Sequence, residues 1–394
     1  MSSRKPKVIA YGFKHFRVEN NKRVAVCKIC GKQINDVIST TSNFVRHLKS
    51  HKESFTEYQN TTSIHIDPLQ PGTFQLEHQQ IKDDPYSPIS MSQPQLDLSH
   101  SIPPHAITRL VRDWLAEDTP NFDPAGVCVG SQDVEATLFC KSPCSILAGI
   151  PFFTAVFTEL GCTVEWMYQE GADLGPGAVT PTAVVRGPAR CVLLGERPAL
   201  NCLARASGIA TRCSKLQYIT SKAGWQGQVA GTRKTTPGFR LVEKYAMLVG
   251  GVSMHRQDLS GMVMLKDNHV WASGSITQAV MDARAVCGFS SKIEVECGSR
   301  EEGSEAAAAG ADIVMLDNFK PEELCVAARL LKEKFPFLLI EASGGVTPSS
   351  LLEYLSPHVD IISLGCITQG CPIVDFSLKV HKTVFEPFYG ESKS

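Results

Sequence analysis

A repeated strand-and-helix unit that starts near Lys292 constrains the fold more than any other feature of this chain. Short apolar runs typical of buried strands alternate there with amphipathic runs typical of helices. We expect strands at 293–297, 313–318, 337–342 and 359–365, and helices at 301–310, 321–334 and 348–355. This alternation predicts a parallel sheet with helical crossovers.

Each predicted strand ends in polar residues or glycine: Glu296, Asp317-Asn318, Ser343-Gly344-Gly345 and Gly365. In a β/α barrel the active site is assembled from the loops that follow the strands. In an open doubly wound sheet the same residues would spread along one edge, so we favour the barrel. Both carboxylates can then face one cavity and bind ribose hydroxyls, directly or through Mg²⁺. The glycine-rich turns suit a phosphate.

Three basic clusters lie between positions 231 and 269 of the chain. They are the loop Gly231-Thr-Arg-Lys-Thr-Thr-Pro-Gly-Phe-Arg240, the pair His255-Arg256, and Lys266-Asp-Asn-His269. Glycine lets a backbone approach a ligand closely, and arginine can bind both oxygens of a carboxylate. The clusters indicate a pocket for a small polyanion, and a solvated basic surface loop is the alternative. With the acidic strand ends, they suggest a phosphorylated sugar beside an anionic acceptor.

These motifs, in order, make the segment from 106 to 388 resemble the quinolinate phosphoribosyltransferase family, the carboxylating nicotinate-nucleotide pyrophosphorylases of NAD synthesis. Further matching motifs are Leu194-Gly-Glu-Arg197, 201–210, Glu294-Val-Glu296, Glu341-Ala-Ser-Gly-Gly345 and Ser363-Leu-Gly365. The resemblance implies an α/β fold with a small sandwich domain and an incomplete, seven-stranded β/α barrel. It also implies phosphoribosyl transfer from phosphoribosyl pyrophosphate to quinolinate with loss of carbon dioxide, which gives nicotinate mononucleotide and pyrophosphate. The chain would bind itself, as a dimer or a hexamer with shared active sites.

Carried over residue by residue, the resemblance implies a basic quinolinate pocket. Its lining would be Arg233, Lys234, Thr235, His255, Arg256 and Lys266. Arg197 would enter from the neighbouring subunit. Pro198 follows it where the family usually has an aliphatic residue, and a proline inside a helix bends the chain.

The resemblance also implies a sugar-phosphate half of the site. Glu296 and Asp317 would hold the ribose and its Mg²⁺, while the phosphate would bind at Ser343, Gly344, Gly345 and Gly365. Catalysis would rest on Lys234, His255, Lys266, Glu296 and Asp317. Lys234 and His255 are both candidates for the proton source after decarboxylation.

The first sixty residues form a basic segment with a metal-binding pattern. They carry twelve Lys and Arg against four Asp and Glu. Cys27 and Cys30, followed by His47 and His51, supply the four ligands of a tetrahedral Zn²⁺ site. Paired free thiols and unrelated histidines are the alternative. The segment resembles a BED-type zinc finger, which implies DNA binding, and a protein-contact role is the competing hypothesis.

The sequence predicts four parts: a finger at 1–59, a disordered linker at 60–104, the sandwich domain at 105–209 and the barrel at 210–388. The C-terminal end of the chain could pack back on the sandwich domain. No apolar run is long enough for a signal peptide or a membrane span, and the scattered cysteines favour a cytoplasmic or nuclear protein. Two rival functions are a DNA-bound regulator with an inactive transferase domain and a transferase for nicotinate without decarboxylation.

Overall fold

The computed structural model describes residues 13–19, 22–30, 32–37, 47 and 97–381. The chain forms two compact units, Met1–Met91 and Ser92–Ser394. The predicted ligand His51 and most of the predicted linker lie outside the described residues. Across the described part of the chain, no helix has the length and apolar character needed to cross a membrane.

The first unit contains a three-stranded antiparallel sheet in the order β1-β2-β3. Its strands are β1 (Phe13–Glu19), β2 (Lys22–Cys27) and β3 (Gln33–Val37). Phe13, Val24 and Ala25 are buried within it. The Cys27 N–H donates to the Lys32 carbonyl at 2.9 Å, so the turn between β2 and β3 is closed by a backbone hydrogen bond.

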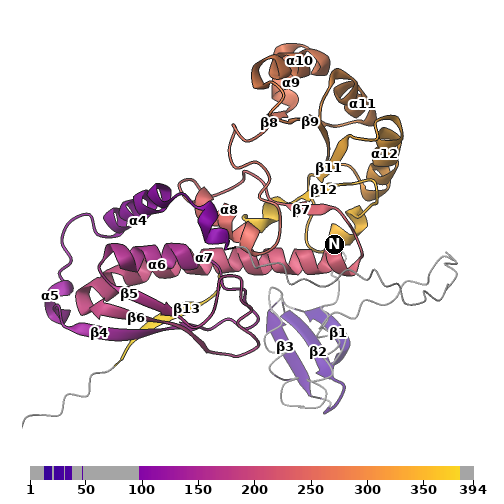
Figure 1. The fold of residues 1–394 in the computed structure, drawn as a ribbon. Coiled ribbons are helices and arrows are strands. Elements are labelled where there is room, and N and C mark those ends of the chain that lie inside the picture. The colour runs from indigo at the N-terminus through magenta and orange to yellow at the C-terminus, as the bar shows by residue number, and fades with distance from the viewer. Residues whose placement is uncertain (1–12, 20–21, 31, 38–46, 48–96, 382–394) are drawn as a thin grey trace, which may run out of the picture. The chain divides into compact units, whose positions relative to one another are not determined.

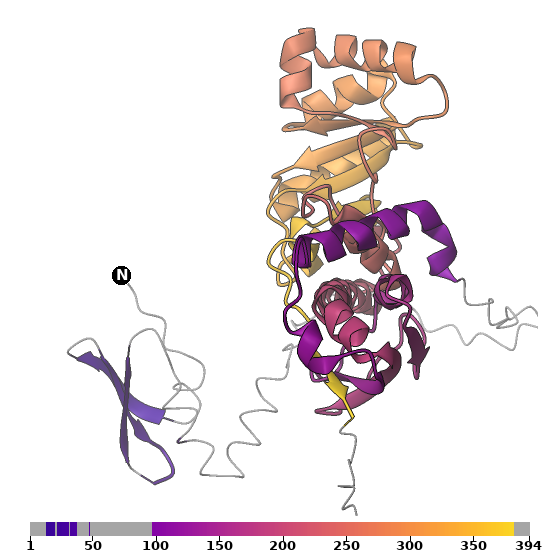
Figure 2. The same ribbon diagram turned by 90° about the vertical axis from the view of Figure 1, so that its left-hand side faces the viewer.

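The second unit begins with a helical segment and a four-stranded antiparallel sheet in the order β13-β4-β6-β5. Its helices are η1 (Leu98–Ser101), α4 (Pro104–Asp118), α5 (Gly126–Val129), α6 (Ile150–Glu159) and α7 (Ala189–Lys222). Its strands are β4 (Asp133–Cys140), β5 (Thr163–Trp166), β6 (Thr180–Pro188) and β13 (Phe376–Val380). Helices α6 and α7 pack against the sheet (Figure 1), and α4 lies over both helices (Figure 2).

The sandwich domain includes segments from both ends of the second unit. Strand β13, near the C-terminus, pairs with β4, so the chain does return to the sandwich domain. At the other end, η1 falls inside the segment predicted to be a linker. Leu98 packs against the core and Ile102 is buried, so residues 97–104 belong to the folded unit.

The rest of the second unit alternates strands with helices around a parallel sheet. The strands are β7 (Gln228–Ala230), β8 (Val263–Leu265), β9 (Ile293–Cys297), β10 (Ile313–Asp317), β11 (Leu339–Ser343) and β12 (Ile361–Ser363). The helices are α8 (Arg240–Val249), α9 (Asp267–Ser273), α10 (Ile276–Cys287), α11 (Arg300–Ala309), α12 (Pro321–Lys334), η2 (Leu351–Tyr354) and η3 (Gly365–Ile367). Helices α10, α11 and α12 lie outside the strands (Figure 1).

The strand order explains why the barrel is incomplete. The six strands run β7-β12-β11-β10-β9-β8, and a parallel bridge from Ala230 to Ser253 adds a seventh position beside β7. No pairing joins this seventh position to β8 among the described residues, so the barrel is open there.

One predicted helix was wrong. Residues 348–355 form only the short 3₁₀ helix η2. The Ser350 N–H donates to the Thr347 hydroxyl at 3.2 Å, and the Thr347 N–H donates to the Ser350 hydroxyl at 3.1 Å. These local side-chain hydrogen bonds compete with the backbone bonds of an α-helix.

Candidate active site

Six of the predicted site residues lie at the carboxyl end of the parallel strands. Glu296 is the last residue but one of β9, and Asp317 and Ser343 are the last residues of β10 and β11. Asp317 pairs in register with Ser343. Lys234, Lys266 and Gly365 follow β7, β8 and β12. Because the strands are parallel, these residues lie on one face of the barrel.

Lys266 and Glu296 form a direct ion pair across neighbouring strands. Their side chains are 44% and 19% exposed, so the pair opens to solvent. Burial raises the pKa of Asp317, and the negative charge of Glu296 raises it further, whereas Lys266 and Lys234 lower it. Two carboxylates that repel each other at a partly open position suit a cation with oxygen ligands.

The loops after β7 and β12 meet at Lys234 and Gly365. A Cβ atom added to Gly365 would lie 3.3 Å from Lys234 Cδ and 3.7 Å from its ammonium nitrogen. Gly344 has a φ of +90°, and a Cβ there would lie 2.6 Å from the Asn318 amide nitrogen. Glycine at 344 is therefore required both by its backbone conformation and by the close approach of the neighbouring loop.

Arg233 and Arg256 bring two partly buried guanidinium groups together. Arg256 donates to the Met262 carbonyl at 3.2 Å, and Arg233 Nε is buried without a hydrogen-bond partner among the described residues. Burial lowers the pKa of Arg256, and the positive charge of Arg233 lowers it further. A desolvated pair of like charges with an unused donor suits an anionic ligand.

His255 points away from the loops at the carboxyl end of the strands, into the interior of the barrel. Its Nε2 lies 3.0 Å from Glu341 Oε2 and 3.7 Å from Glu294 Oε2. Its Nδ1 accepts the Arg256 N–H at 2.8 Å, and only 9% of the side chain is exposed. Both ring nitrogens therefore have protein partners, which fixes the Nε2–H form as the donor to Glu341.

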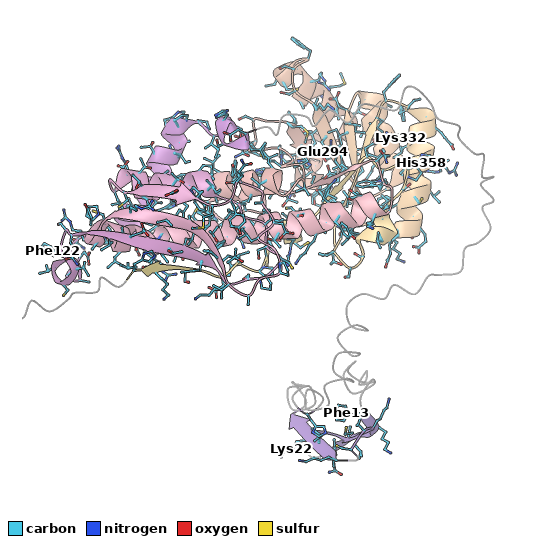
Figure 3. The ribbon with its side chains drawn as sticks, turned by 60° about the horizontal axis from the view of Figure 1, so that its bottom comes forward. Phe13, Lys22, Phe122, Glu294, Lys332 and His358 are labelled. Carbon is cyan, nitrogen blue, oxygen red and sulfur yellow. The ribbon has the colours of Figure 1, made fainter. Side chains whose placement is uncertain are left out.

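Glu294 and Glu341 were not assigned a role from the sequence, although both stand in the quoted motifs. Both are fully buried, and Glu294 appears among the barrel strands in Figure 3. Both Glu294 oxygens and Glu341 Oε1 have no hydrogen-bond partner among the described residues. Burial raises the pKa of Glu294, and the negative charge of Glu341 raises it further. The alternation of side chains along a strand could have indicated a role for Glu294, because Glu294 and Glu296 must face the same side of β9.

The donor atoms of His255, Glu294 and Glu341 also lie within 4.8 Å of one another, close enough for a metal ion. Protonation of Glu294, which its raised pKa favours, is the alternative way to offset the charge of this cluster.

Lys244 was also missed. It lies on α8, is fully buried, and its ammonium donates to the carbonyls of Met254 and Arg256, the latter at 3.1 Å. Burial, followed by the positive charges of Arg240, Arg233 and Arg256, lowers the pKa of Lys244 to about 8. Its contacts fix the backbone on both sides of His255.

Arg197 is not brought to this site within one chain. It is exposed on α7, which continues through Pro198, and it has no side-chain hydrogen bond or ion pair among the described residues. Arg205, an α7 residue that does reach the barrel loops, lies two turns further on, about 12 Å along the axis at 1.5 Å per residue.

In the first unit, Cys27, Cys30 and His47 have ligand atoms within 4.8 Å of one another. Cys30 Sγ lies 3.3 Å from His47 Nε2. Two thiols and an imidazole at this spacing fit three corners of a tetrahedral Zn²⁺ site.

Family profiles match most of the chain. The profile described as quinolinate phosphoribosyl transferase, C-terminal domain, matches residues 209–379, and that of the N-terminal domain matches residues 122–207. The BED zinc finger profile matches residues 13–52.

Relatives and solved structures agree with the profiles. The nicotinate-nucleotide pyrophosphorylase (carboxylating) of Rattus norvegicus is 54% identical over 284 residues, which cover 72% of this chain and 94% of that protein. The enzyme of the same name from Dictyostelium discoideum is 45% identical over 300 residues, 73% of this chain and 100% of that protein. The structure of the nicotinate-nucleotide pyrophosphorylase from Francisella tularensis superposes with a TM-score of 0.65 at 33% identity, over 71% of this chain and 98% of that one. The chain belongs to the quinolinate phosphoribosyltransferase family and carries an N-terminal BED zinc finger domain.

Proposed function

We propose that the second unit transfers the phosphoribosyl group of phosphoribosyl pyrophosphate to quinolinate and releases carbon dioxide, giving nicotinate mononucleotide and pyrophosphate. The observation that carries this proposal is the convergence of two kinds of charge at one end of the barrel. Arg233 and Arg256 offer partly desolvated cations to a dicarboxylate, while Glu296 and Asp317 lie beside Lys266 and Lys234.

The first half of the reaction separates the ribose C1 carbon from pyrophosphate. The carboxylates of Glu296 and Asp317 would hold the ribose hydroxyls and Mg²⁺, which would offset the negative charge that develops on the leaving group. Lys234, beside Gly365, would bind phosphate oxygens together with the backbone of Ser343, Gly344 and Gly345. The pyridine nitrogen of quinolinate would then attack C1, aligned by the arginines and Thr235.

The second half removes the carboxylate next to the quaternised nitrogen and needs a proton for the resulting carbanion. We assign this proton to Lys234 rather than His255. The Lys234 side chain is exposed at the barrel mouth, whereas both His255 ring nitrogens are bonded to protein groups. His255 would then position Arg256, because its Nδ1 accepts a hydrogen bond from the Arg256 backbone N–H.

The test is an assay of the purified protein with phosphoribosyl pyrophosphate, Mg²⁺ and either quinolinate or nicotinate. We expect nicotinate mononucleotide to form with quinolinate and not with nicotinate. Product from nicotinate at a comparable rate would favour a transferase without decarboxylation, and no product from either acid would favour the DNA-bound regulator.

We further propose that the first unit binds Zn²⁺ and that the finger held by this ion binds DNA. Cys27, Cys30 and His47 would hold the ion, with His51 as the fourth ligand. Lys14, Lys22 and Lys32 are exposed on the described part of the finger, in a segment of net charge plus eight over the first sixty residues. Figure 3 shows Lys22 at the surface of this sheet. Such charge favours phosphate contacts that weaken as salt rises, which a binding titration at two salt concentrations would test.

A further inference from the structure

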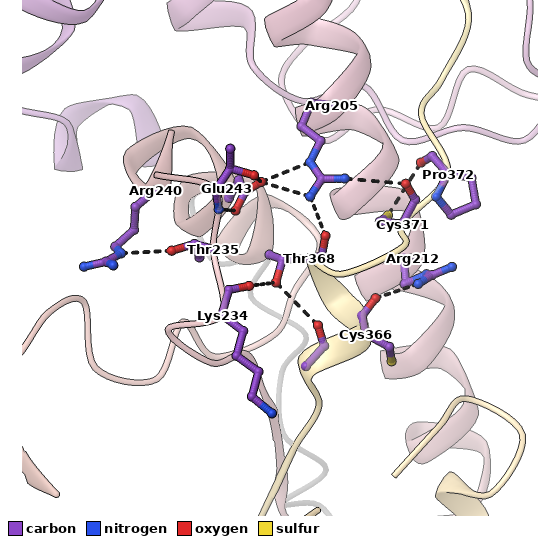
Figure 4. Close-up of polar contacts among 12 residues, drawn as sticks. Arg205, Arg212, Lys234, Thr235, Arg240, Glu243, Cys366, Thr368, Cys371 and Pro372 are labelled. Carbon is purple, nitrogen blue, oxygen red and sulfur yellow. Dashed lines mark hydrogen bonds and ion pairs between the residues drawn. The ribbon is translucent and has the colours of Figure 1, made fainter. Parts of the chain in front are cut away.

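A polar network centred on buried Glu243 and Thr368 joins the long helix α7 to two loops of the candidate site. Figure 4 shows it running from Arg205 through Glu243 to the loop of Thr235, and from Arg205 through Thr368 to Lys234. None of Arg205, Glu243, Thr236 or Thr368 has a role in the proposed site so far. Resting on the proposed function, we infer that this network positions Lys234 beside Gly365 so that the two loops bind one phosphate group of the sugar substrate together.

Glu243 is the centre of the network. It is fully buried on α8, and its two oxygens accept four hydrogen bonds. Arg205 donates through Nε at 3.1 Å and Nη2 at 2.9 Å, and Thr236 donates through its N–H at 3.0 Å and its hydroxyl at 2.9 Å. A buried carboxylate this well satisfied fixes the groups around it, because breaking one bond leaves a charge uncompensated. Thr236 lies two residues after Lys234, so the loop after β7 is tied to α8.

Arg205 extends the network to the loop after β12. Besides Glu243, its guanidinium donates to the Thr368 carbonyl and, at 3.5 Å, to the Cys371 carbonyl. Arg212, two turns further along α7, donates to the Cys366 carbonyl at 2.5 Å. Helix α7 therefore anchors the segment from Cys366 to Cys371, directly after Gly365, at both of its ends.

Thr368 links the two loops directly. Its hydroxyl donates to the Lys234 carbonyl at 2.6 Å, and only 3% of the residue is exposed. This bond holds the Lys234 backbone against the segment that begins at Gly365, where the ammonium lies 3.7 Å from the position of an added Cβ. The Lys234 side chain is exposed, whereas Thr368, which bonds its backbone, and Glu243 are buried. Arg205, Glu243 and Thr368 are therefore positioning residues, which act on the phosphate only through Lys234 and Gly365.

The test replaces Thr368 by valine, which keeps the shape of the side chain and removes the hydroxyl. Loss of one such bond typically lowers an affinity about two- to tenfold. We expect the KM for phosphoribosyl pyrophosphate to rise by about this factor and the KM for quinolinate to stay nearly constant. The kcat should fall as well, because Lys234 is also the assigned proton source. Thr368→Ser keeps the hydroxyl and should restore the wild-type KM.

A matched control is Thr220→Val. Thr220 is also a buried threonine, but its hydroxyl bonds only carbonyls of its own helix α7, Leu216 and Gln217. The Thr220→Val variant should lower the stability of the protein without changing the KM for either substrate. If Thr368→Val does not fold, Thr236→Val replaces it, because Thr236 is exposed and its hydroxyl bonds Glu243 alone.

A second readout separates this inference from the proposed function. Binding of inorganic pyrophosphate, measured by calorimetry, should weaken in Thr368→Val by a similar factor even if the protein proves unable to use quinolinate. Unchanged pyrophosphate affinity and an unchanged KM for the sugar substrate in a folded Thr368→Val protein would overturn the inference. An equal loss in Thr220→Val would overturn it as well, because the effect would then be one of general stability.

Discussion

At the scale of single residues, charge and burial account for the two halves of the candidate site. Arg233 and Arg256 lie together with their charges partly desolvated, and Arg233 Nε has no hydrogen-bond partner among the described residues. Truncating one partner of a desolvated charge pair typically costs about 2–5 kcal/mol. Arg233→Ala and Arg256→Ala should therefore each weaken quinolinate binding by about this amount in calorimetry. Arg329→Ala, which removes an exposed ion pair with Glu333 on α12, is the control. Wild-type affinity in both variants would remove these residues from the pocket.

The buried carboxyl of Glu294 predicts a pH dependence of stability. Burial and Glu341 raise the pKa of Glu294 above the value of about 4.3 that it has in the unfolded chain. The folded protein then keeps a proton that the unfolded chain releases, so stability falls as the pH rises from about 5 towards the raised pKa.

Glu294→Gln cannot release a proton at this position. Its melting temperature in Mg²⁺-free buffer should therefore fall less between pH 5 and pH 8 than that of the wild type. Glu322→Gln, on the exposed surface of α12, should follow the wild-type profile. Parallel profiles for Glu294→Gln and the wild type would show that Glu294 is charged in the folded protein.

At the scale of elements, the ends of β9 and β10 define the sugar half of the site. Asp317 ends β10 and is in register with Ser343 at the end of β11. Asp317→Ala should raise the KM for phosphoribosyl pyrophosphate by tenfold or more, about 1.4 kcal/mol, and leave equilibrium binding of quinolinate nearly intact. Asp282→Ala on α10 serves as an exposed control. Loss of quinolinate binding with normal use of the sugar would mean that the two halves of the site are reversed.

The same elements show how far a sequence can predict this structure. Strand β9 and helix α12 have their predicted bounds, because the alternation of apolar residues with glutamates in the strand and a proline at the helix start are local signals. The burial of His255 could not be predicted, since it depends on Glu341, which is 86 residues further along the chain. The short η2 was also unpredictable from apolar spacing, because hydroxyl groups at 347 and 350 decide its backbone.

At the scale of the whole molecule, Arg197 is a predicted pocket residue that lies exposed on α7, away from the loops at the carboxyl end of the barrel. We propose that a second copy of the chain supplies it. Arg197→Ala and Lys266→Ala should each be inactive, and mixing them should restore activity, because a mixed dimer has one site with neither defect. No recovery after proven subunit exchange would contradict a shared site.

The two units should also be separable. Asp97 caps η1 and Leu98 packs against the transferase core, so a chain that starts at Asp97 should keep its turnover. It should lose any salt-sensitive affinity for duplex DNA. In the full-length protein, Cys27→Ser should unfold the finger alone, because small zinc domains draw their folding energy from the ion. Greatly reduced turnover of the shortened chain would show that the finger supports the enzyme. A full-length protein without DNA affinity at low salt would favour a protein-contact role for the finger.

The most direct test of the central claim follows carbon dioxide from quinolinate that is isotopically labelled in the carboxylate next to the ring nitrogen. With phosphoribosyl pyrophosphate and Mg²⁺, the protein should release labelled carbon dioxide and nicotinate mononucleotide in equal amounts. Arg233→Ala should lose both products together. Nicotinate mononucleotide formed without labelled carbon dioxide, or no product from a folded wild-type protein, would contradict the account.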